Sequence, residues 1–446
     1  MKIMKFGGTS VASAPRIRHV ADLITATDEP KIVVLSAMAG TTNTLVEISR
    51  QLVERHRHEA LILLTKLKRK YEQETQALFP NPQSYDKAWT LVNETFFFLE
   101  QLCYQESFTL YDEKKILARG ELLSTAMMLR HLEDRGIKTA GLPALEYMRT
   151  DKNAEPDLEY IEMHLRQILS RCPSDVNLFI TEGYICRNAF GDIDNLQRGG
   201  SDYTASLVGA ALRADEIQIW TDIDGMHNND PRVVEATEPV RRLHFEEAAE
   251  LAYFGAKILH PTCIQPAKAR SIPVRLLNTL VPEAPGTLIS TDTDKDLIKA
   301  VAAKDDLTMI RVRSSHQLSA WSFASKVFAV FEHLRIPIDM IASTEQSISL
   351  TIETSRLVPE LEEELEQLGT LEIERGMTIV CIVGDLESEN IGFEAQILEA
   401  LREVPIWMIS YGGSDYNVSV LVEACNKRTA LKALSDHLFI RRSSQA

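Results

Sequence analysis

Residues 5–10 read Lys-Phe-Gly-Gly-Thr-Ser and directly follow an apolar stretch at residues 1–4. This order predicts a β-strand that ends in a glycine turn, with a lysine at the mouth of the turn. Bare glycines at positions 7 and 8 let backbone N–H groups point at the oxygens of a polyphosphate, while the ammonium of Lys5 neutralises charge. The chain contains neither G-x-x-x-x-G-K-[ST] nor G-x-G-x-x-G at a strand-to-helix junction. Taken alone, the two glycines are equally typical of an ordinary strand-end turn.

A second glycine-rich segment, Arg-Gly-Gly-Ser-Asp at 198–202, precedes a helix predicted over 203–211. The N–H groups at a helix N-terminus bind anions well, so this segment complements the first. Ser201 or Asp202 is expected to be the N-cap residue. Capping alone would explain the aspartate, but it would not explain the preceding Arg-Gly-Gly.

A third polar segment follows a buried-strand pattern at 217–220 and reads Thr-Asp-Ile-Asp-Gly at 221–225, with Asp-Pro-Arg at 230–232. In open α/β sheets, ligands bind outside the carboxyl ends of the strands. We therefore expect Lys5, Asp202 and Asp222 to meet in one crevice.

Composition excludes several classes of protein. The chain has 446 residues and a net charge of −16, without a basic run of the kind that binds nucleic acid. Its length predicts two or three domains. Six cysteines show no C-x-x-C spacing, which favours reduced thiols in the cytoplasm and no metal site. No apolar run reaches about 18 residues, so no membrane partner is expected.

Seven segments in chain order carry a resemblance to a known family. They are KFGGTS at 5–10, SAMAGTTN at 36–43, RGELLST at 119–125, QRGGSDYTA at 197–205, WTDIDG at 220–225, DPR at 230–232 and FGAKILHP at 254–261. The chain resembles the aspartate kinases (aspartokinases) of the amino-acid kinase superfamily, and most of all their monofunctional, lysine-sensitive type.

The resemblance implies an α/β amino-acid kinase domain over 1–292, built on an open, mostly parallel sheet flanked by helices. Beyond it, two successive patterns of strand, helix, strand, strand and helix indicate an internal βαββαβ repeat. This repeat resembles paired ferredoxin-like ACT domains, expected at 305–375 and 376–446. The second repeat lacks a last strand, and we expect the apolar segment 297–303 to complete its sheet.

The implied reaction transfers the γ-phosphoryl group of ATP to the side-chain carboxylate of L-aspartate and yields 4-phospho-L-aspartate. In the family this is the first step of lysine, threonine and methionine biosynthesis. A carboxylate with a pKa of about 3.9 is already ionised at neutral pH, so no general base is needed. Lys5 is expected to stabilise the transferring group, Asp202 to hold a lysine or a metal in register, and Mg²⁺ to accompany ATP.

Substrate selection needs one group for an ammonium and another for an α-carboxylate. Glu121 is expected to accept from the amine, and the planar fork of Arg198 suits a bidentate carboxylate contact. The alternative for Glu121 is a solvated helix N-terminus. The full set of substrate residues implied by the resemblance is Thr42, Glu121, Arg198, Gly199, Gly200 and Ser201.

Nucleotide contacts come to this chain from the same resemblance. His227 stands where relatives usually have tyrosine, and its imidazole is smaller and can become charged. Lys257 is expected to be a second lysine on the polyphosphate, with an ordinary exposed helix lysine as the alternative. The implied ATP-binding residues are Lys5, Phe6, Gly7, Gly8, Thr221, Asp222, His227, Arg232 and Lys257.

ACT domains bind amino acids at interfaces, and the resemblance implies an effector site with two acids that suit a dibasic ligand such as L-lysine. Its residues are Asp339, Ser343, Thr344 and Glu345, with ordinary strand-edge charges as the alternative. Gln317 and Ser322 depart from the residues common in lysine-inhibited relatives. Pairing of ACT domains between chains implies at least a homodimer.

Two other functions stay open at this point. One is a kinase of the same fold for another acidic amino acid, and the other is a nonenzymatic amino-acid sensor with a degenerate kinase domain. Glu121 and Arg198 disfavour the first, and Lys5 and Asp202 disfavour the second.

Overall fold

The computed structural model describes residues 1–196, 199–255, 260–292, 298–314, 320–386 and 392–440. The chain forms two compact units. The first consists of Met1–Met226 and Leu259–Thr291, and the second of His227–Ile258 and Asp292–Ala446. The domain limits expected from the sequence, 1–292, 305–375 and 376–446, stay a prediction.

The first unit is built on a mostly parallel sheet, as the sequence predicts. Strands β4 (Leu178–Glu182), β2 (Lys31–Leu35), β1 (Lys2–Phe6), β7 (Glu216–Thr221) and β9 (Val274–Asn278) lie side by side in this order and are all parallel. Strand β3 (Thr139–Leu142) extends the sheet next to β4, and β10 (Thr287–Ser290) pairs with β9 in the antiparallel sense. Strands β5 (Ile185–Arg187) and β6 (Ile193–Asn195) form a separate hairpin.

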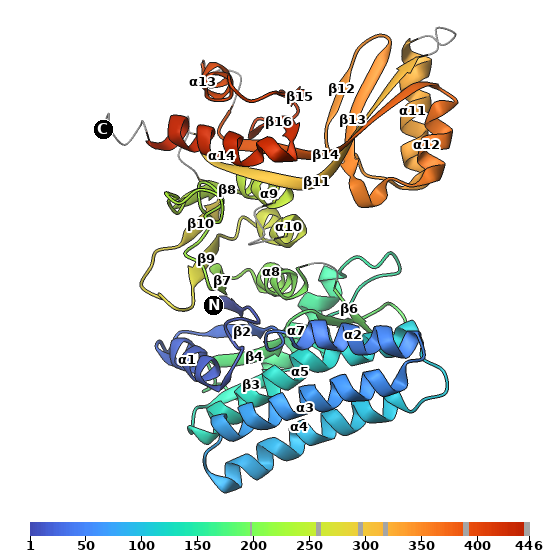
Figure 1. Cartoon of the computed structure of the whole chain (residues 1–446). Coiled ribbons are helices and arrows are strands. Elements are labelled where there is room, and N and C mark those ends of the chain that lie inside the picture. The colour runs from blue at the N-terminus through green and yellow to red at the C-terminus, as the bar shows by residue number, and fades with distance from the viewer. Residues whose placement is uncertain (197–198, 256–259, 293–297, 315–319, 387–391, 441–446) are drawn as a thin grey trace. The chain divides into compact units, whose positions relative to one another are not determined.

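Helices cover this sheet. Helices α2 (Thr41–Val53), α3 (Arg57–Leu78), α4 (Pro82–Cys103) and α5 (Leu110–Asp134) pack one against the next (Figure 1). They bury an apolar core that includes Phe6, Tyr71 and Phe96. The remaining helices of the unit are α1 (Ala14–Thr25), α6 (Ala144–Tyr147), α7 (Leu158–Arg171), α8 (Gly200–Leu212) and α10 (Pro261–Ala269).

The second unit contains one six-stranded antiparallel sheet. Its strand order is β12 (Ile341–Ser343), β13 (Ser347–Glu353), β11 (Ile298–Ser314), β14 (Gly369–Gly384), β16 (Asn417–Glu423) and β15 (Met408–Ser410). Helices α11 (Ala320–Leu334) and α12 (Pro359–Glu366) cover one half, and α13 (Phe393–Ala400) and α14 (Lys427–Ser435) cover the other. Strand β8 (Arg242–His244) and helix α9 (Phe245–Tyr253) precede them in the chain.

The two halves of this sheet share their central strands. The internal repeat implies that each module has its own strands, but the last strand of the first module and the first strand of the second are both part of β14. Likewise, the first strand of the first module is continuous with the segment before it in β11. From Ala300 to Ala303, β11 pairs with Val383 to Val380, whereas its second half pairs with the first half of β14. Register shifts between Lys304 and Thr308 let β11 pass from one half to the other. Leu297 lies outside the described residues.

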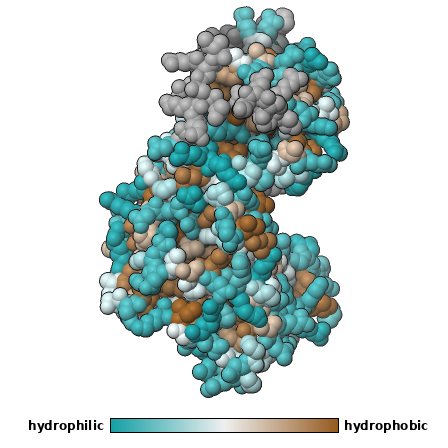
Figure 2. Space-filling model, turned by 90° about the vertical axis from the view of Figure 1, so that its left-hand side faces the viewer, coloured by the Kyte–Doolittle hydropathy of each residue, from teal (hydrophilic) through white to brown (hydrophobic). Residues whose placement is uncertain are grey.

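Hydrophilic residues predominate on the face shown in Figure 2, with apolar residues scattered among them. Among the helices in the described part of the chain, none combines the length and apolar character needed to cross a membrane.

Candidate active site

The lysine of the first glycine segment meets the aspartate of the second. Lys5 lies near the carboxyl end of β1, and its Nζ is 2.6 Å from Oδ1 of Asp202 in the first turn of α8. Their side chains are only 12% and 14% exposed. Two segments almost 200 residues apart in sequence thus form one ion pair at the edge of the sheet where parallel strands end.

The two glycines after Phe6 differ in what surrounds them. A Cβ added to Gly8 would lie 2.8 Å from the carbonyl oxygen of Ala37, so this glycine allows two loops to approach. A Cβ added to Gly7 would meet only Nζ of Lys5 at 3.7 Å and the carbonyl oxygen of Trp220 at 3.8 Å. The space above Gly7 is therefore open toward the ammonium, as a phosphate-binding turn requires.

Helix α8 begins earlier than the sequence predicts. Its N-cap residue is Gly199, with φ of 75°, so Ser201 and Asp202 lie in the first turn and the prediction that one of them caps the helix is wrong. A cap in the left-handed region favours glycine over Ser or Asp. A Cβ on Gly199 would also lie 2.6 Å from Sγ of Cys263, and one on Gly200 would lie 2.3 Å from Cδ2 of Tyr184. The packing around both positions therefore requires glycine.

Glu121 lies in the middle of α5 and is 3% exposed, which contradicts the alternative of a solvated helix N-terminus. Its Oε1 accepts a hydrogen bond from the backbone N–H of Ala37 at 3.3 Å. Its Oε2 is buried and has no hydrogen-bonding partner within the described ranges. Burial raises the pKa of Glu121 to about 8, and the charge of Glu182 adds to the rise. Ionisation of this carboxyl group is therefore unfavourable in the folded protein.

The structure places two of the other residues expected to bind the substrate. Thr42 is half-buried near the start of α2. Ser201 packs against Gly183, where an added Cβ would lie 2.6 Å from its side chain. Arg198 and, in the predicted nucleotide set, Lys257 lie outside the described residues.

The nucleotide residues of the first unit lie at the ends of β1 and β7. Phe6 is fully buried and stacks on Trp220 with ring centroids 5.6 Å apart, so only its backbone is available to a ligand. The N–H of Gly7 donates to the carbonyl of Trp220 at 3.2 Å, which ties the glycine turn to β7. Thr221 donates its hydroxyl to Oδ1 of the exposed Asp222 at 3.1 Å.

Two predicted nucleotide residues belong to the second unit. His227 is half-buried, and its Nδ1 lies 2.9 Å from Oγ1 of Thr237. Arg232 is exposed and makes two contacts with Asp230, at 2.9 and 2.8 Å. This bidentate partner lowers the pKa of Asp230.

The predicted effector residues do not all face the same space. Ser343 and Thr344 line a surface hollow of about 500 Å³, whereas Asp339 and Glu345 do not line it. Oδ1 of Asp339 instead accepts from the hydroxyl of Tyr253 at 2.6 Å and pairs with Nζ of Lys304 at 2.7 Å. Its Oδ2 is buried without a hydrogen-bonding partner in the described part of the chain.

Two buried polar residues that the sequence analysis did not single out lie at the same edge of the parallel sheet of the first unit. Glu182 ends β4, and its Oε2 accepts from the backbone N–H of Ala144 at 2.8 Å. Thr279 follows β9 and is completely buried. Both come directly after or at the end of an apolar strand, the same signal that singled out Asp222, so the pattern could have found them.

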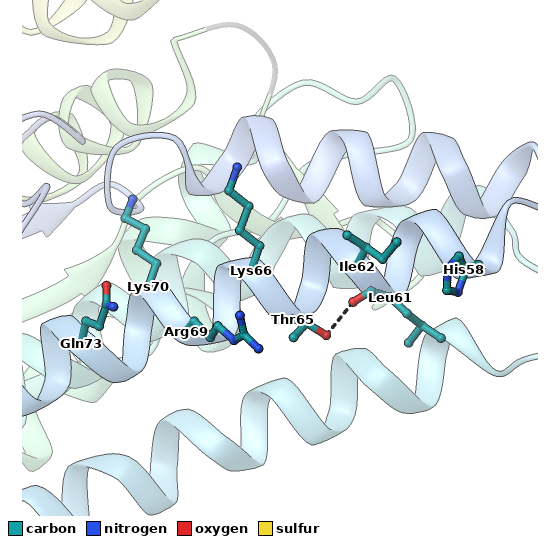
Figure 3. Close-up of a pocket in the computed structure, with 8 residues that line it drawn as sticks. All are labelled: His58, Leu61, Ile62, Thr65, Lys66, Arg69, Lys70 and Gln73. Carbon is teal, nitrogen blue, oxygen red and sulfur yellow. Dashed lines mark hydrogen bonds between the residues drawn. The ribbon is translucent and has the colours of Figure 1, made fainter.

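A hollow away from these residues lies on the first unit. It has a volume of about 720 Å³ and runs along α3, where Lys66, Arg69 and Lys70 project from one helix (Figure 3). None of the predicted site residues lines it. The Nζ of Lys70 donates to the backbone carbonyl of Ala39 at 2.6 Å, so this lysine contacts the loop that precedes α2. Within the described ranges, no group of three or more His, Cys, Asp or Glu side chains is arranged to hold a metal ion.

Comparisons with known proteins define the class. A model of the amino acid kinase family matches residues 1–278, and a model of the ACT domain matches residues 380–438. The chain belongs to the amino acid kinase family.

Individual relatives narrow the class further. Lysine-sensitive aspartokinase 3 of Escherichia coli (strain K12) is 33% identical over 450 residues, which cover 98% of this chain and 99% of that protein. Two crystal structures of E. coli aspartokinase III are 31% identical and each cover 98% of this chain. One, in complex with aspartate and ADP (R-state), superposes with a TM-score of 0.84 over 100% of its own chain. The other, with lysine and aspartate (T-state), gives 0.79 over 99%. Within its family, this chain is therefore an aspartate kinase.

Proposed function

We propose that Lys5 is the electrophilic group of the aspartate kinase reaction and that Asp202 holds it in place. The ion pair of 2.6 Å between them, beside the open face of Gly7, is the observation that carries this proposal. Asp202 lies in the first turn of α8, where the helix dipole favours a negative charge. The aspartate thus keeps the ammonium beside the glycine turn.

In the proposed reaction, an oxygen of the substrate's side-chain carboxylate attacks the γ-phosphorus of ATP. The bond to the bridging oxygen breaks, and ADP leaves with the electron pair. Because the nucleophile is already an anion, the protein contributes positioning and charge stabilisation rather than proton transfer. The ammonium of Lys5 offsets the repulsion between an anionic nucleophile and an anionic donor.

Glu121 is proposed to select the α-ammonium of L-aspartate. The support is its buried Oε2, for which the described part of the chain supplies no hydrogen-bond donor. A ligand ammonium would supply both a donor and a compensating charge. Arg198 with Gly199, Gly200, Ser201 and Thr42 is proposed to receive the carboxylates.

The phosphoryl donor is proposed to enter as MgATP, with Mg²⁺ held by phosphate oxygens and water rather than by a protein cage. Its phosphates would lie over Gly7 and Gly8. The base and ribose would contact Thr221 and Asp222, with further contacts proposed from His227, Arg232 and Lys257.

L-Lysine is proposed as the regulator, bound through Asp339 with Ser343, Thr344 and Glu345. The buried, unsatisfied Oδ2 of Asp339 supports an amine-bearing ligand. The same carboxylate already holds the ammonium of Lys304, which is the type of group that the effector would bring. Effector binding is therefore proposed to proceed by exchange of one ammonium for another.

We further propose a homodimer formed through the ACT modules and located in the cytoplasm. Apolar side chains exposed on and beside the two edge strands β12 and β15 support association, namely Ile341, Trp407 and Ile409. All six cysteines are free thiols, in keeping with a reducing compartment. Light scattering that reports the mass of a single chain would reject the dimer.

The test of the catalytic proposal is turnover of ATP with L-aspartate and hydroxylamine, which traps the acyl phosphate. Lys5→Met should abolish hydroxamate formation, because it keeps the length of the side chain and removes its charge. The same variant should retain the wild-type thermal midpoint within a few degrees and still bind L-lysine. Undiminished turnover by Lys5→Met would refute the role assigned to Lys5.

A further inference from the structure

Thr279 joins three segments of the first unit at the edge where the parallel strands end. It follows β9 and is 0% exposed, so each of its polar groups needs a protein partner. The backbone N–H donates to the carbonyl of Thr221 at 2.7 Å. The backbone carbonyl accepts from Nε2 of His19 in α1 at 2.6 Å. The hydroxyl lies 2.8 Å from the hydroxyl of Ser10.

The partner hydroxyl belongs to the turn that ends the first glycine segment. Ser10 is 1% exposed, and its backbone N–H donates to the carbonyl of Gly7 at 3.0 Å. This bond closes the turn over residues 7–10. The side chain of Ser10 therefore fixes the far end of the glycine turn, and Thr279 fixes Ser10.

The three bonds of Thr279 have different consequences for substitution. The two backbone bonds, to Thr221 and His19, survive any change of side chain. The hydroxyl bond is the only one that a substitution removes, and valine has nearly the shape of threonine. Replacement by valine thus leaves the segment anchored and removes only its hydroxyl link to the glycine turn, which stays tied to β7 through the N–H of Gly7.

We infer that Thr279 is a positioning residue for the phosphoryl donor, acting through the hydroxyl of Ser10 to hold the glycine turn of residues 7–10 at a set distance from Thr221. The inference rests on the proposed nucleotide site. It assigns a role to two hydroxyl groups that touch neither substrate.

The expected signature is a selective loss of nucleotide affinity. Thr279→Val should raise the KM for ATP and the Kd for ADP about fivefold to tenfold, which corresponds to one lost buried hydrogen bond. The KM for aspartate should change less than twofold, because the residues proposed to bind it belong to other segments. Thr279→Ser, which retains the hydroxyl, should stay within twofold of wild type in both constants.

A double variant separates positioning from stability. Each single variant, Thr279→Val or Ser10→Ala, leaves one buried hydroxyl without its partner and should lower the thermal midpoint. The double variant removes both hydroxyls, so its thermal midpoint should recover while the KM for ATP stays raised. Thr75→Val is the matched control, since Thr75 is also 0% exposed and its hydroxyl donates to the backbone carbonyl of Tyr71 at 2.6 Å, within α3. It should leave the KM for ATP unchanged.

Steady-state hydroxamate kinetics, ADP calorimetry and thermal unfolding of the full chain give all these readouts. An unchanged KM for ATP in Thr279→Val would overturn the inference. So would a raised KM that returns to normal in the double variant, because it would then follow stability alone. Failure of the proposed function looks different: wild type would form no hydroxamate from aspartate, or Lys5→Met would remain active.

Discussion

Glu121→Gln offers a test in which stability and activity are expected to move in opposite directions. The substitution keeps the size of the side chain and removes its charge. Burial raises the pKa of the Glu121 carboxyl from 4.5 to about 8, against the lowering effect of the hydrogen bond from Ala37. The group therefore holds its proton in the folded, empty protein at neutral pH, whereas it is ionised in the unfolded chain.

This difference in pKa makes the free energy of unfolding of wild type fall as pH rises. An acid whose pKa is raised on folding contributes its full stability below the unfolded value of 4.5, and that contribution is lost as pH rises toward the folded value of about 8. A difference of about 3.5 units between those values corresponds to a total loss of roughly 5 kcal/mol, at 1.36 kcal/mol per unit. Most of this loss lies between pH 5 and pH 8. Glutamine does not titrate and avoids the loss entirely.

The first assay is denaturation of wild type and Glu121→Gln at pH 6 and pH 8.5. The free energy of unfolding of the variant should rise relative to wild type by roughly 2 to 3 kcal/mol between these two pH values. The second assay is aspartate kinetics. Loss of a charged hydrogen bond of about 1.5–3 kcal/mol predicts a fall in kcat/KM for aspartate of about 10- to 150-fold, with the KM for ATP unchanged.

The pH profile of wild type supplies an independent check. Only the ionised form of Glu121 accepts an ammonium, so kcat/KM for aspartate should rise about tenfold per pH unit below the pKa of about 8 and level off above it. Glu182→Gln gives a second profile for comparison, because it removes the neighbouring charge that helps to raise the pKa of Glu121. Its profile should move to lower pH. A stability difference between wild type and Glu121→Gln that is constant with pH, or unchanged aspartate kinetics, would refute the reasoning.

Two further predictions concern the glycine cap and the effector. Gly199→Ala should lower the free energy of unfolding by about 1–3 kcal/mol and impair turnover. The backbone at residue 199 is left-handed, and the added Cβ would lie 2.6 Å from Sγ of Cys263. A thermal midpoint equal to that of wild type would contradict this prediction. Lys304→Met removes the ammonium that pairs with the buried carboxylate of Asp339. The variant should therefore have a lower free energy of unfolding and a severalfold lower L-lysine concentration for half-inhibition. Lys326→Met, at an exposed lysine, serves as the control. Unchanged inhibition would exclude the proposed exchange.

Local signals predicted the parts of the structure that depend on local geometry. The strand ends at Lys5 and Asp222 and the helix start after the glycine segment follow from the alternation of apolar runs with Gly and polar residues. The mostly parallel sheet was implied by the resemblance to the aspartate kinases. The approach of Lys5 to Asp202 was expected only as two strand ends in one crevice. Its distance is a property of the folded chain.

Other features depend on contacts that the sequence does not display. Helix α8 begins at Gly200 because Gly199 adopts a left-handed conformation against Cys263, and no pattern near 199 reveals that neighbour. The burial of Glu121 depends on how α5 packs, so the sequence left a solvated helix N-terminus open as the alternative to a substrate contact. Strands β11 and β14 run through both ACT modules because irregular residues near 305–307 bend β11 without ending it.

The proposed site divides its charges between two tasks. Lys5 is already paired with Asp202, so its ammonium is held by the protein and is available to the phosphoryl group from the outset. Glu121, in contrast to Lys5, has no charged partner for its Oε2 in the described part of the chain. Its ionisation in the empty site is therefore unfavourable. Only a ligand that brings its own cation to this oxygen offsets that cost. An acid whose amine is acylated brings no such charge, and Glu121 would stay protonated beside it. We therefore propose that this carboxylate acts as a filter for free amino acids, with its unfavourable burial as the physical basis of that selectivity.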